Sequence, residues 1–247
     1  MRIETTDFVA GAQAAHGLTV VIDVFRAFSL AAHAFARGVE TIVPVASVEA
    51  ARELKRLHPD WLLLGERQAR PLPGFDGGNS PARLADFELA GRRLIHTTHA
   101  GTQGLTAAHG ADEVLTGALV NAAAIVRYIL ARRPGIVTLV RMGHEARERC
   151  AEDDLCAELI ECRLRGEHAW APDVWEQLRH APSAAKFFDP ACDWAPQEDF
   201  DLCARLDVFD FVLQLRTVEP PRTDDGGRQD AGLRCLRRID VPIGHGR

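Results

Sequence analysis

The amino-acid sequence predicts an α/β fold, a three-layer α/β/α arrangement around a mostly parallel mixed sheet. Short apolar runs rich in β-branched residues alternate with helix-forming segments as far as Gly166. This alternation is typical of a parallel sheet whose two faces are covered by helices. After Gly166 the alternation stops, and two strand-like runs follow that can pair with each other antiparallel. The predicted sheet is therefore mixed.

Length and composition favour one domain over residues 1–247. The 247 residues can bury a large core, and 47% apolar with 26% charged residues is ordinary for a globular protein. No linker, internal repeat or low-complexity segment divides the sequence. The net charge of −6 predicts no general attraction to nucleic acid or to an anionic membrane, but it would suit a divalent cation. The sequence leaves the oligomeric state open, and a homo-oligomer is compatible with it.

The strands are predicted from apolar runs that are bounded by turn-forming residues. In chain order these runs are residues 18–23, 41–45, 61–64, 93–98, 113–117, 136–140, 209–215 and 233–239. The last two form the predicted antiparallel pair, and the turn-rich stretch 223–228 lies between them.

The helices are predicted from the capping residues at their ends. Ser47 and Asn121 are placed as N-caps, Ser80 as an N-cap with Pro81 at the first helical position, and Gly38 just after a helix end. The helical segments are an alanine-rich one that follows residue 24, further ones that begin near 47, 80 and 102, and segments 121–128, 152–160, 173–180 and 197–206.

The six cysteines never occur as Cys-x-x-Cys, and three of them recur at six-residue intervals in a predicted helix. A zinc site or a disulfide framework is therefore disfavoured, and free thiols in a reducing cytosol are expected. The N-terminal residues lack the apolar core of a secretory signal, and no run is long enough to span a bilayer. The predicted location is cytoplasmic.

Asp23 and Arg26 lie where the first predicted strand ends and the next helix begins. The carboxyl ends of strands form the ligand-binding edge of an α/β sheet. An acid and an arginine so placed can hold a metal ion and a phosphate group. They can equally form an ion pair that ties the turn together, and the spacing alone favours neither interpretation.

A long glycine-rich connection follows the third predicted strand and ends at Ser80. Loops of this length are uncommon in compact domains and tend to be functional, and their glycines let backbone N–H groups approach an anion. Glu66 and Arg67 begin this connection, on the same predicted sheet edge as Asp23. Asn79 is a candidate ligand contact, although asparagine in a loop often caps the loop's own backbone.

Two further groups lie at predicted helix starts. Thr98 and Thr102 bracket a strand-to-helix turn, where hydroxyl and N–H groups are good phosphate donors. Glu152 and Asp153 occupy the first turn of another helix, where acids ordinarily complement the helix dipole.

These stretches resemble the 2-phosphosulfolactate phosphatase family. The family's pattern of Gly-Glu-Arg, then Gly-Phe-Asp, one variable residue and Gly-Asn-Ser-Pro is matched by Gly65-Glu66-Arg67 and Gly74-Phe75-Asp76-Gly77-Gly78-Asn79-Ser80-Pro81. Further matching blocks are Asp23-Val24-Phe25-Arg26-Ala27, Val120-Asn121-Ala122 and Glu152-Asp153-Asp154-Leu155-Cys156-Ala157. The chain departs from the family at Ala100, with His99 beside it, where the family usually has asparagine in Thr-Thr-x-Asn-Gly-Thr.

The resemblance implies a Mg²⁺-dependent phosphatase that hydrolyses the phosphate ester of a small sulfonated or carboxylated hydroxy acid, 2-phosphosulfolactate giving sulfolactate and phosphate. It implies metal binding by Asp23, Glu66, Glu152 and Asp153, with catalytic roles for Asp23, Glu66 and Asp153. The implied substrate-binding residues are Arg26, Arg67, Asn79, Ser80, Thr98 and Thr102. Two alternatives stay open, a non-catalytic homologue that keeps an anion-binding cleft and a phosphatase of a different small phosphorylated acid.

Other catalytic signatures are missing from the sequence. It contains neither a phosphate-binding G-x-x-x-x-G-K-[ST] loop nor G-x-G-x-x-G, which leaves nucleotide binding without support. The G-x-S-x-G elbow of serine hydrolases and the Cys-x₅-Arg loop of cysteine phosphatases are also absent.

Overall fold

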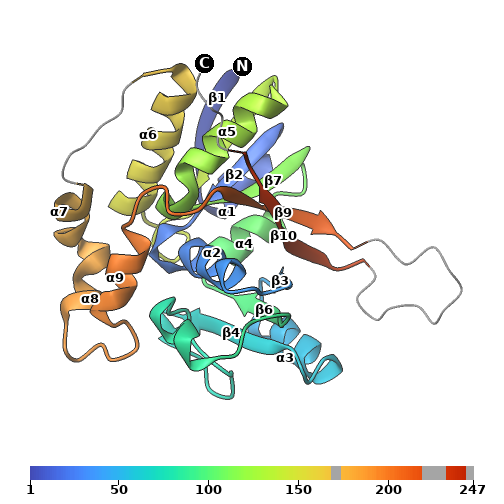
Figure 1. Cartoon of the computed structure of the whole chain (residues 1–247), viewed down its shortest axis with the longest axis vertical. Coiled ribbons are helices and arrows are strands. Elements are labelled where there is room, and N and C mark those ends of the chain that lie inside the picture. Colours follow the sequence, from blue (N-terminus) through green and yellow to red (C-terminus); the bar gives the residue numbers. More distant parts are fainter. Residues whose placement is uncertain (168–173, 219–231, 243–247) are drawn as a thin grey trace, which may run out of the picture.

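A computed structural model describes residues 1–167, 174–218 and 232–242 of the chain (Figure 1). The strands in this part are β1 (Arg2–Asp7), β2 (Leu18–Ile22), β3 (Thr41–Pro44), β4 (Leu62–Arg67), β5 (Arg70–Pro71), β6 (Arg93–Thr97), β7 (Glu113–Gly117), β8 (Ile136–Arg141), β9 (Phe211–Thr217) and β10 (Arg234–Asp240). They form one sheet in the order β1-β8-β2-β7-β9-β10-β3-β6-β4-β5.

The helices lie between the strands in the chain. The α-helices are α1 (Phe8–Ala14), α2 (Ser29–Ala36), α3 (Val48–Leu57), α4 (Gly101–Ala107), α5 (Ala122–Arg132), α6 (Ala151–Arg165), α7 (Val174–Arg179), α8 (Ala185–Phe188) and α9 (Gln197–Cys203). A π-helical turn, η1 (Val24–Phe28), joins β2 to α2, and short 3₁₀ helices form η2 (Ala82–Asp86), η3 (Leu119–Asn121) and η4 (Pro182–Ala184).

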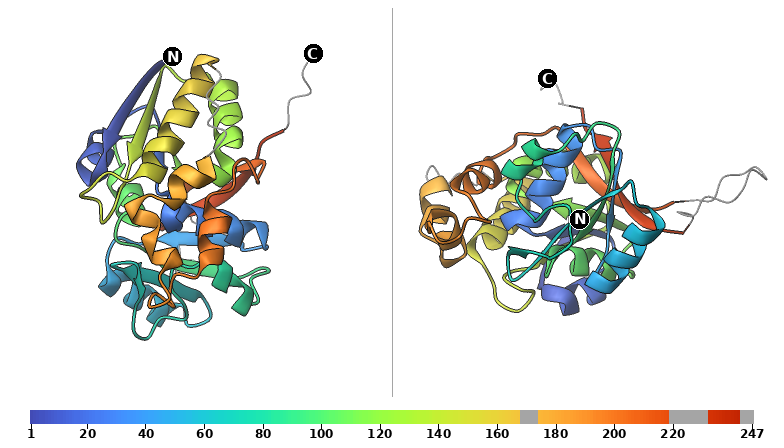
Figure 2. Two further views of the ribbon diagram at one scale, coloured as in Figure 1. Left: turned by 90° about the vertical axis from the view of Figure 1, so that its left-hand side faces the viewer. Right: turned by 90° about the horizontal axis from the view of Figure 1, so that it is seen from below.

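The sheet contains two groups of parallel strands. β1, β8, β2 and β7 pair in parallel, and so do β3, β6 and β4. The antiparallel pair β9–β10 lies between the groups and pairs antiparallel with β7 on one side and with β3 on the other. In the left view of Figure 2 the first group runs roughly vertically, while the second crosses the lower part of the molecule. The fold is therefore a mixed, mostly parallel sheet, as the sequence predicts.

Helices cover both faces of the sheet, which gives the three predicted layers. In β2, Val21 packs in the core on the side of α2 and α4, whereas Val20 and Ile22 pack in the core on the side of α5 and α6. Because successive side chains of a strand point to opposite faces, a strand buried on both faces is a continuous apolar run. A third, smaller core lies under α3.

Each predicted strand is present, with one important difference in length. The apolar run at residues 61–64 was expected to end there, but β4 continues to Arg67 and makes a short hairpin with β5. The sequence patterns did not predict β1, α1, β5 or α8. The predicted turn at residues 223–228 and the predicted helix start at Asp173 lie outside the described residues.

Two predicted caps differ from the structure. Asn121 stands at the N-cap position of α5 but makes no side-chain cap, because its Nδ2 donates instead to the carbonyl oxygen of Phe211. Ser80 does accept a hydrogen bond from the backbone N–H of Arg83, at 3.3 Å, yet the helix that follows is only the 3₁₀ turn η2. The N-cap at Ser47 is confirmed. Gly38 is confirmed as the residue just after a helix end, where its φ is positive.

Candidate active site

Four acidic side chains predicted from the sequence line one cavity. Asp23 follows β2, Glu66 lies in β4, and Glu152 and Asp153 belong to the first turn of α6. All four are buried. Residues from distant parts of the chain are thus brought together at one place, as expected for the carboxyl ends of strands in an α/β sheet.

Backbone N–H groups fix Asp23 and Asp153 from two sides. Asp23 Oδ2 accepts a hydrogen bond from Gly101 N at 2.7 Å, and Asp153 accepts from Val24 N and Gly143 N, each at 2.8 Å. A Cβ atom at position 101 would lie 2.7 Å from Asp23 Oδ2, so this close approach requires glycine there. The two carboxylates are therefore preorganised by main chain rather than by other side chains.

Glu66 and Glu152 are also held in place. Glu66 accepts hydrogen bonds from the backbone N–H groups of Ala69 and His99, both at 2.7 Å. Glu152 accepts a hydrogen bond of 2.5 Å from Ser183 Oγ. Since the turn between β6 and α4 donates to Asp23 and to Glu66, the carboxyl ends of the two parallel groups meet at this cavity.

The acids repel one another in surroundings that exclude water. Burial, and after it the neighbouring Glu66, raises the pKa of Asp23 to about 7. Burial, and after it Asp23, raises the pKa of Asp153 well above its usual range. Such a cluster favours a bound cation, because a positive charge would relieve the repulsion and the desolvation together.

The donor set can be compared with the needs of Mg²⁺. In the described part of the chain, no group of three or more His, Cys, Asp or Glu side chains is arranged to hold a metal ion by itself. Mg²⁺ does not require one, because it is usually held by one or two carboxylates together with water and substrate phosphate oxygens. The buried oxygens of Asp23 and Asp153, whose pKa values are raised by burial and by neighbouring acids, fit that pattern of binding.

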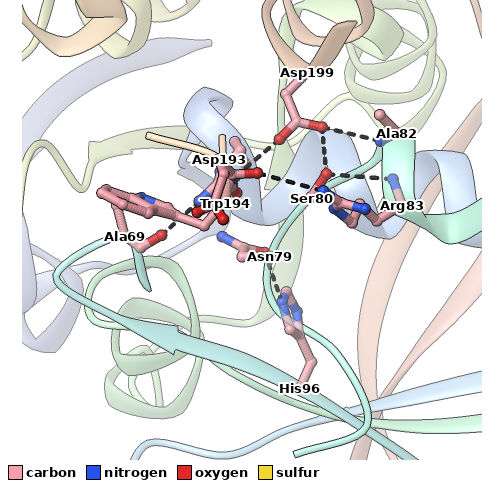
Figure 3. Close-up of polar contacts among 10 residues, drawn as sticks. Ala69, Asn79, Ser80, Ala82, Arg83, His96, Asp193, Trp194 and Asp199 are labelled. Atoms are coloured by element: carbon pink, nitrogen blue, oxygen red, sulfur yellow. Dashed lines mark hydrogen bonds and ion pairs between the residues drawn. The ribbon is translucent and has the colours of Figure 1, made fainter. Parts of the chain in front are cut away.

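Arg26 lines the cavity but is bound into a buried network. Its Nη1 donates to Asp199 Oδ2 and to the carbonyl oxygen of Trp194, both at 2.8 Å, and its Nη2 donates to the carbonyl oxygen of Ala69 at 2.7 Å. Asp199 also accepts from Ser80 Oγ at 2.7 Å (Figure 3). Arg26 thus pairs with Asp199 rather than with Asp23, and Ser80 serves this network instead of lining the cavity.

The structure does not bring Arg67 into the cavity. Because β4 continues through this residue, the side chains of Glu66 and Arg67 point to opposite faces of the sheet. The Arg67 guanidinium donates to the carbonyl oxygen of Ala46 and to Thr97 Oγ1, each at 3.0 Å. The sequence predicts both residues just after the strand, on one edge of the sheet. It does not show that the strand, and with it the alternation of side chains, continues through them.

Thr98 and Thr102 are committed to the start of α4. Thr98 N donates to Thr102 Oγ1 at 2.9 Å, and Thr102 N donates to Thr98 Oγ1 at 3.1 Å. Both side chains are buried, and neither lines the cavity. Their hydroxyls fix the turn that presents His99 N and Gly101 N to the acids.

Asn79 lines the cavity and is oriented by a neutral histidine. Burial lowers the pKa of His96 to about 4, so its ring is neutral near pH 7. His96 Nε2 lies 3.0 Å from Asn79 Oδ1, and in Figure 3 the amide nitrogen of Asn79 points away from that contact. The arrangement leaves the Asn79 amide nitrogen as a donor for an anion.

Several residues that line the cavity or support it gave no recognisable signal in the sequence. Asp199 stands in the first turn of a predicted helix, where an acid is ordinarily explained by the helix dipole. Ser183 and Lys186 belong to η4 and α8, which the sequence patterns did not predict. His99 and Ala100, the point of departure from the family pattern, also line the cavity.

We expect Arg26 and Arg67 to respond differently to substitution by lysine, the first in stability and the second in activity. Arg26→Lys should lower the free energy of unfolding by roughly 2–4 kcal/mol, because an ammonium group cannot bridge Asp199 and two carbonyl oxygens. Arg67→Lys should change kcat/KM by less than about threefold, since its guanidinium lies outside the cavity. Urea unfolding measures the change in stability, and steady-state kinetics measure the change in kcat/KM, on both variants. A tenfold loss of kcat/KM in Arg67→Lys would show that Arg67 does contact the substrate.

Comparisons with known proteins agree with the resemblance seen in the sequence. Residues 4–217 match the family described as 2-phosphosulpholactate phosphatase. A protein of Bacillus subtilis (strain 168) named "Probable 2-phosphosulfolactate phosphatase" is 31% identical over 206 residues, which cover 81% of this chain and 87% of that protein. A protein of the same name from Caldanaerobacter subterraneus subsp. tengcongensis is 41% identical over 211 residues, covering 80% and 87%. One from Clostridium perfringens (strain 13 / Type A) is 27% identical over 239 residues, covering 91% and 96%.

Proposed function

The chain belongs to the 2-phosphosulfolactate phosphatase family, and from that premise we propose that it hydrolyses 2-phosphosulfolactate to sulfolactate and phosphate with Mg²⁺. The observation that supports this most strongly is the convergence of four buried carboxylates on one cavity where the two parallel groups meet. Phosphate ester hydrolysis requires charge stabilisation around the transferring group and a positioned water.

In the proposed mechanism Asp23 and Asp153 would hold the ion. Bound there, Mg²⁺ would neutralise charge on the phosphate oxygens and make a nearby water more acidic. Glu66 and Glu152 lie in the same cavity and are the carboxylates available to orient that water and accept its proton. The Asn79 amide nitrogen would donate to a phosphate oxygen.

The rigid support for these groups comes from the backbone and from Asp199. Arg26 is held by Asp199 and by the carbonyl oxygens of Trp194 and Ala69, so its position does not depend on the ligand. These hydrogen bonds fix the connection between β4 and η2, which forms one wall of the cavity. Catalytic groups held in this way need little reorganisation when charge develops.

Other features of the chain are compatible with the proposal. All six cysteines are free, and burial raises the pKa of Cys150 and Cys156, which makes a thiolate nucleophile unfavourable. Free thiols also favour a reducing compartment such as the cytoplasm. No helix in the described ranges is long and apolar enough to cross a membrane.

A non-catalytic anion binder is the less favoured alternative. A cavity with four buried carboxylates would repel an anion unless a cation were bound with it. Ala100, which offers no polar group to the cavity, instead favours the second alternative, a phosphatase whose preferred acid differs from 2-phosphosulfolactate.

A panel of phosphate esters tests the substrate class. We expect the protein with Mg²⁺ to release phosphate from 2-phosphosulfolactate and from a carboxylated phospho-hydroxy acid. Its kcat/KM for at least one of them should be about tenfold or more above that for an ester without a second acid group. Equal kcat/KM for all esters would contradict a substrate with a second acid group.

A further inference from the structure

Lys186 is a cationic side chain of the cavity with no acidic partner among the described residues. It lies on α8, three residues after Ser183, and lines the same cavity as the four acids. Within residues 1–167, 174–218 and 232–242 its ammonium group makes no hydrogen bond and no ion pair within 4.0 Å. Its Nζ lies 5.0 Å from the centre of the Phe187 ring, a cation–π contact.

The other cationic side chains near the cavity already bind other groups of the protein. Arg26 is paired with the buried carboxylate of Asp199, and Arg67 points to the opposite face of the sheet. The sequence contains a single other lysine, Lys55, and its Nζ lies 2.9 Å from Asp76 outside the cavity. Among the described residues, Lys186 is therefore the cation of the cavity that remains available to a ligand.

Lys186 lines the cavity together with Arg26, Asp23 and Glu152. Burial, and after it the charge of Arg26, lowers the pKa of Lys186, while the attraction of Glu152 and Asp23 opposes this shift. Ser183 donates to Glu152, which fixes the segment just before α8 against the acid cluster. An ammonium group so placed, without a carboxylate bound to it, presents its N–H donors to an incoming anion.

We propose that Lys186 binds the phosphate group of the substrate and is a catalytic residue of this enzyme. The inference rests on the proposed function and extends it to a residue that no motif of the sequence marks. A phosphate dianion that enters a cavity with four carboxylates needs more positive charge than the metal alone supplies. Lysine is well suited to phosphate as a point charge with several donors.

Phosphate binding by two matched variants tests the proposal. Lys186→Met and Lys55→Met each remove one positive charge, and they replace the sequence's only two lysines. With Mg²⁺ present, titration calorimetry with inorganic phosphate should show a dissociation constant raised about tenfold or more in Lys186→Met and unchanged in Lys55→Met. Thermal melting of both variants confirms that they are folded. A dissociation constant in folded Lys186→Met equal to that of the wild type would overturn the proposal.

Steady-state kinetics then show whether Lys186 binds the phosphate or the second acid group of the substrate. If Lys186 binds the phosphate, kcat/KM should fall by the same factor, about tenfold or more, for esters with and without a second acid group. A loss confined to the esters with a second acid group would put Lys186 on that group and overturn the assignment. If the wild type hydrolyses no ester but its phosphate affinity depends on Lys186, the proposed function fails while Lys186 as the phosphate ligand stands.

Discussion

Replacing Asp23 by asparagine will lower kcat/KM by about a thousandfold or more and leave the protein folded. The substitution removes the charged oxygen that we assign to the metal. It keeps the fold because asparagine Oδ1 can still accept the hydrogen bond of 2.7 Å from Gly101 N. The asparagine Nδ2 would face Ala27 N. In the wild type Ala27 N lies 3.4 Å from the Asp23 carboxylate, a long hydrogen bond, so little hydrogen bonding is lost there. Steady-state kinetics and thermal melting on the same preparation measure both effects.

The pH dependence of stability provides a control for that variant. Burial and Glu66 raise the pKa of Asp23 to about 7, so the folded protein binds this proton more tightly than the unfolded chain does. In chelator, the wild type should therefore lose stability as the pH rises from about 4 to 7. Asparagine does not titrate, so Asp23→Asn should lose several degrees less in Tm across this window. If the variant unfolds, Asp23 has a structural rather than a ligand-binding role. If it loses as much Tm as the wild type, the proton that the folded protein binds in this window is not on Asp23.

The strands were predictable from the sequence where they are buried on both faces. β2, for example, is a run rich in β-branched residues, and every residue in it is buried. By contrast β1 is a partly exposed edge strand of mostly polar residues, and its pattern resembles an ordinary polar N-terminus. The helix α8 has only four residues, too few for any periodicity to appear.

The arrangement of the two parallel groups was not predictable from local patterns. It depends on the pairing of β9 and β10 between β7 and β3, and those contacts join residues that are far apart in the sequence. The sequence did predict that β9 and β10 pair with each other, because a turn-rich stretch separates two strand-like runs.

The candidate site was predicted in part. Asp23 was found because an acid that directly follows a buried strand lies at the ligand-binding edge. Arg67 was placed on the substrate because the apolar run stops at Leu64, whereas β4 continues three residues further and turns the side chain away. Lys186 reaches the cavity, and Asp199 reaches Arg26, only through tertiary packing, which no spacing in the sequence reports.

Removal of Mg²⁺ should abolish the activity. The cavity concentrates negative charge from four carboxylates, and one of its two cationic side chains among the described residues, Arg26, is already paired with Asp199. A phosphorylated acid would then meet a repulsive field unless a divalent ion, held by Asp23 and Asp153, offset this charge. We expect the loss to be on the order of a thousandfold, since the ion would supply several kcal/mol of charge stabilisation in the transition state.

The measurement that tests this account most directly is the initial rate of phosphate release from 2-phosphosulfolactate, recorded in excess chelator and again after Mg²⁺ is restored. The account predicts a rate near background in chelator, full recovery with Mg²⁺ in the wild type, and no recovery in Asp23→Asn. Full wild-type activity in excess chelator would contradict it, because the carboxylates of this cavity would then have no metal to hold.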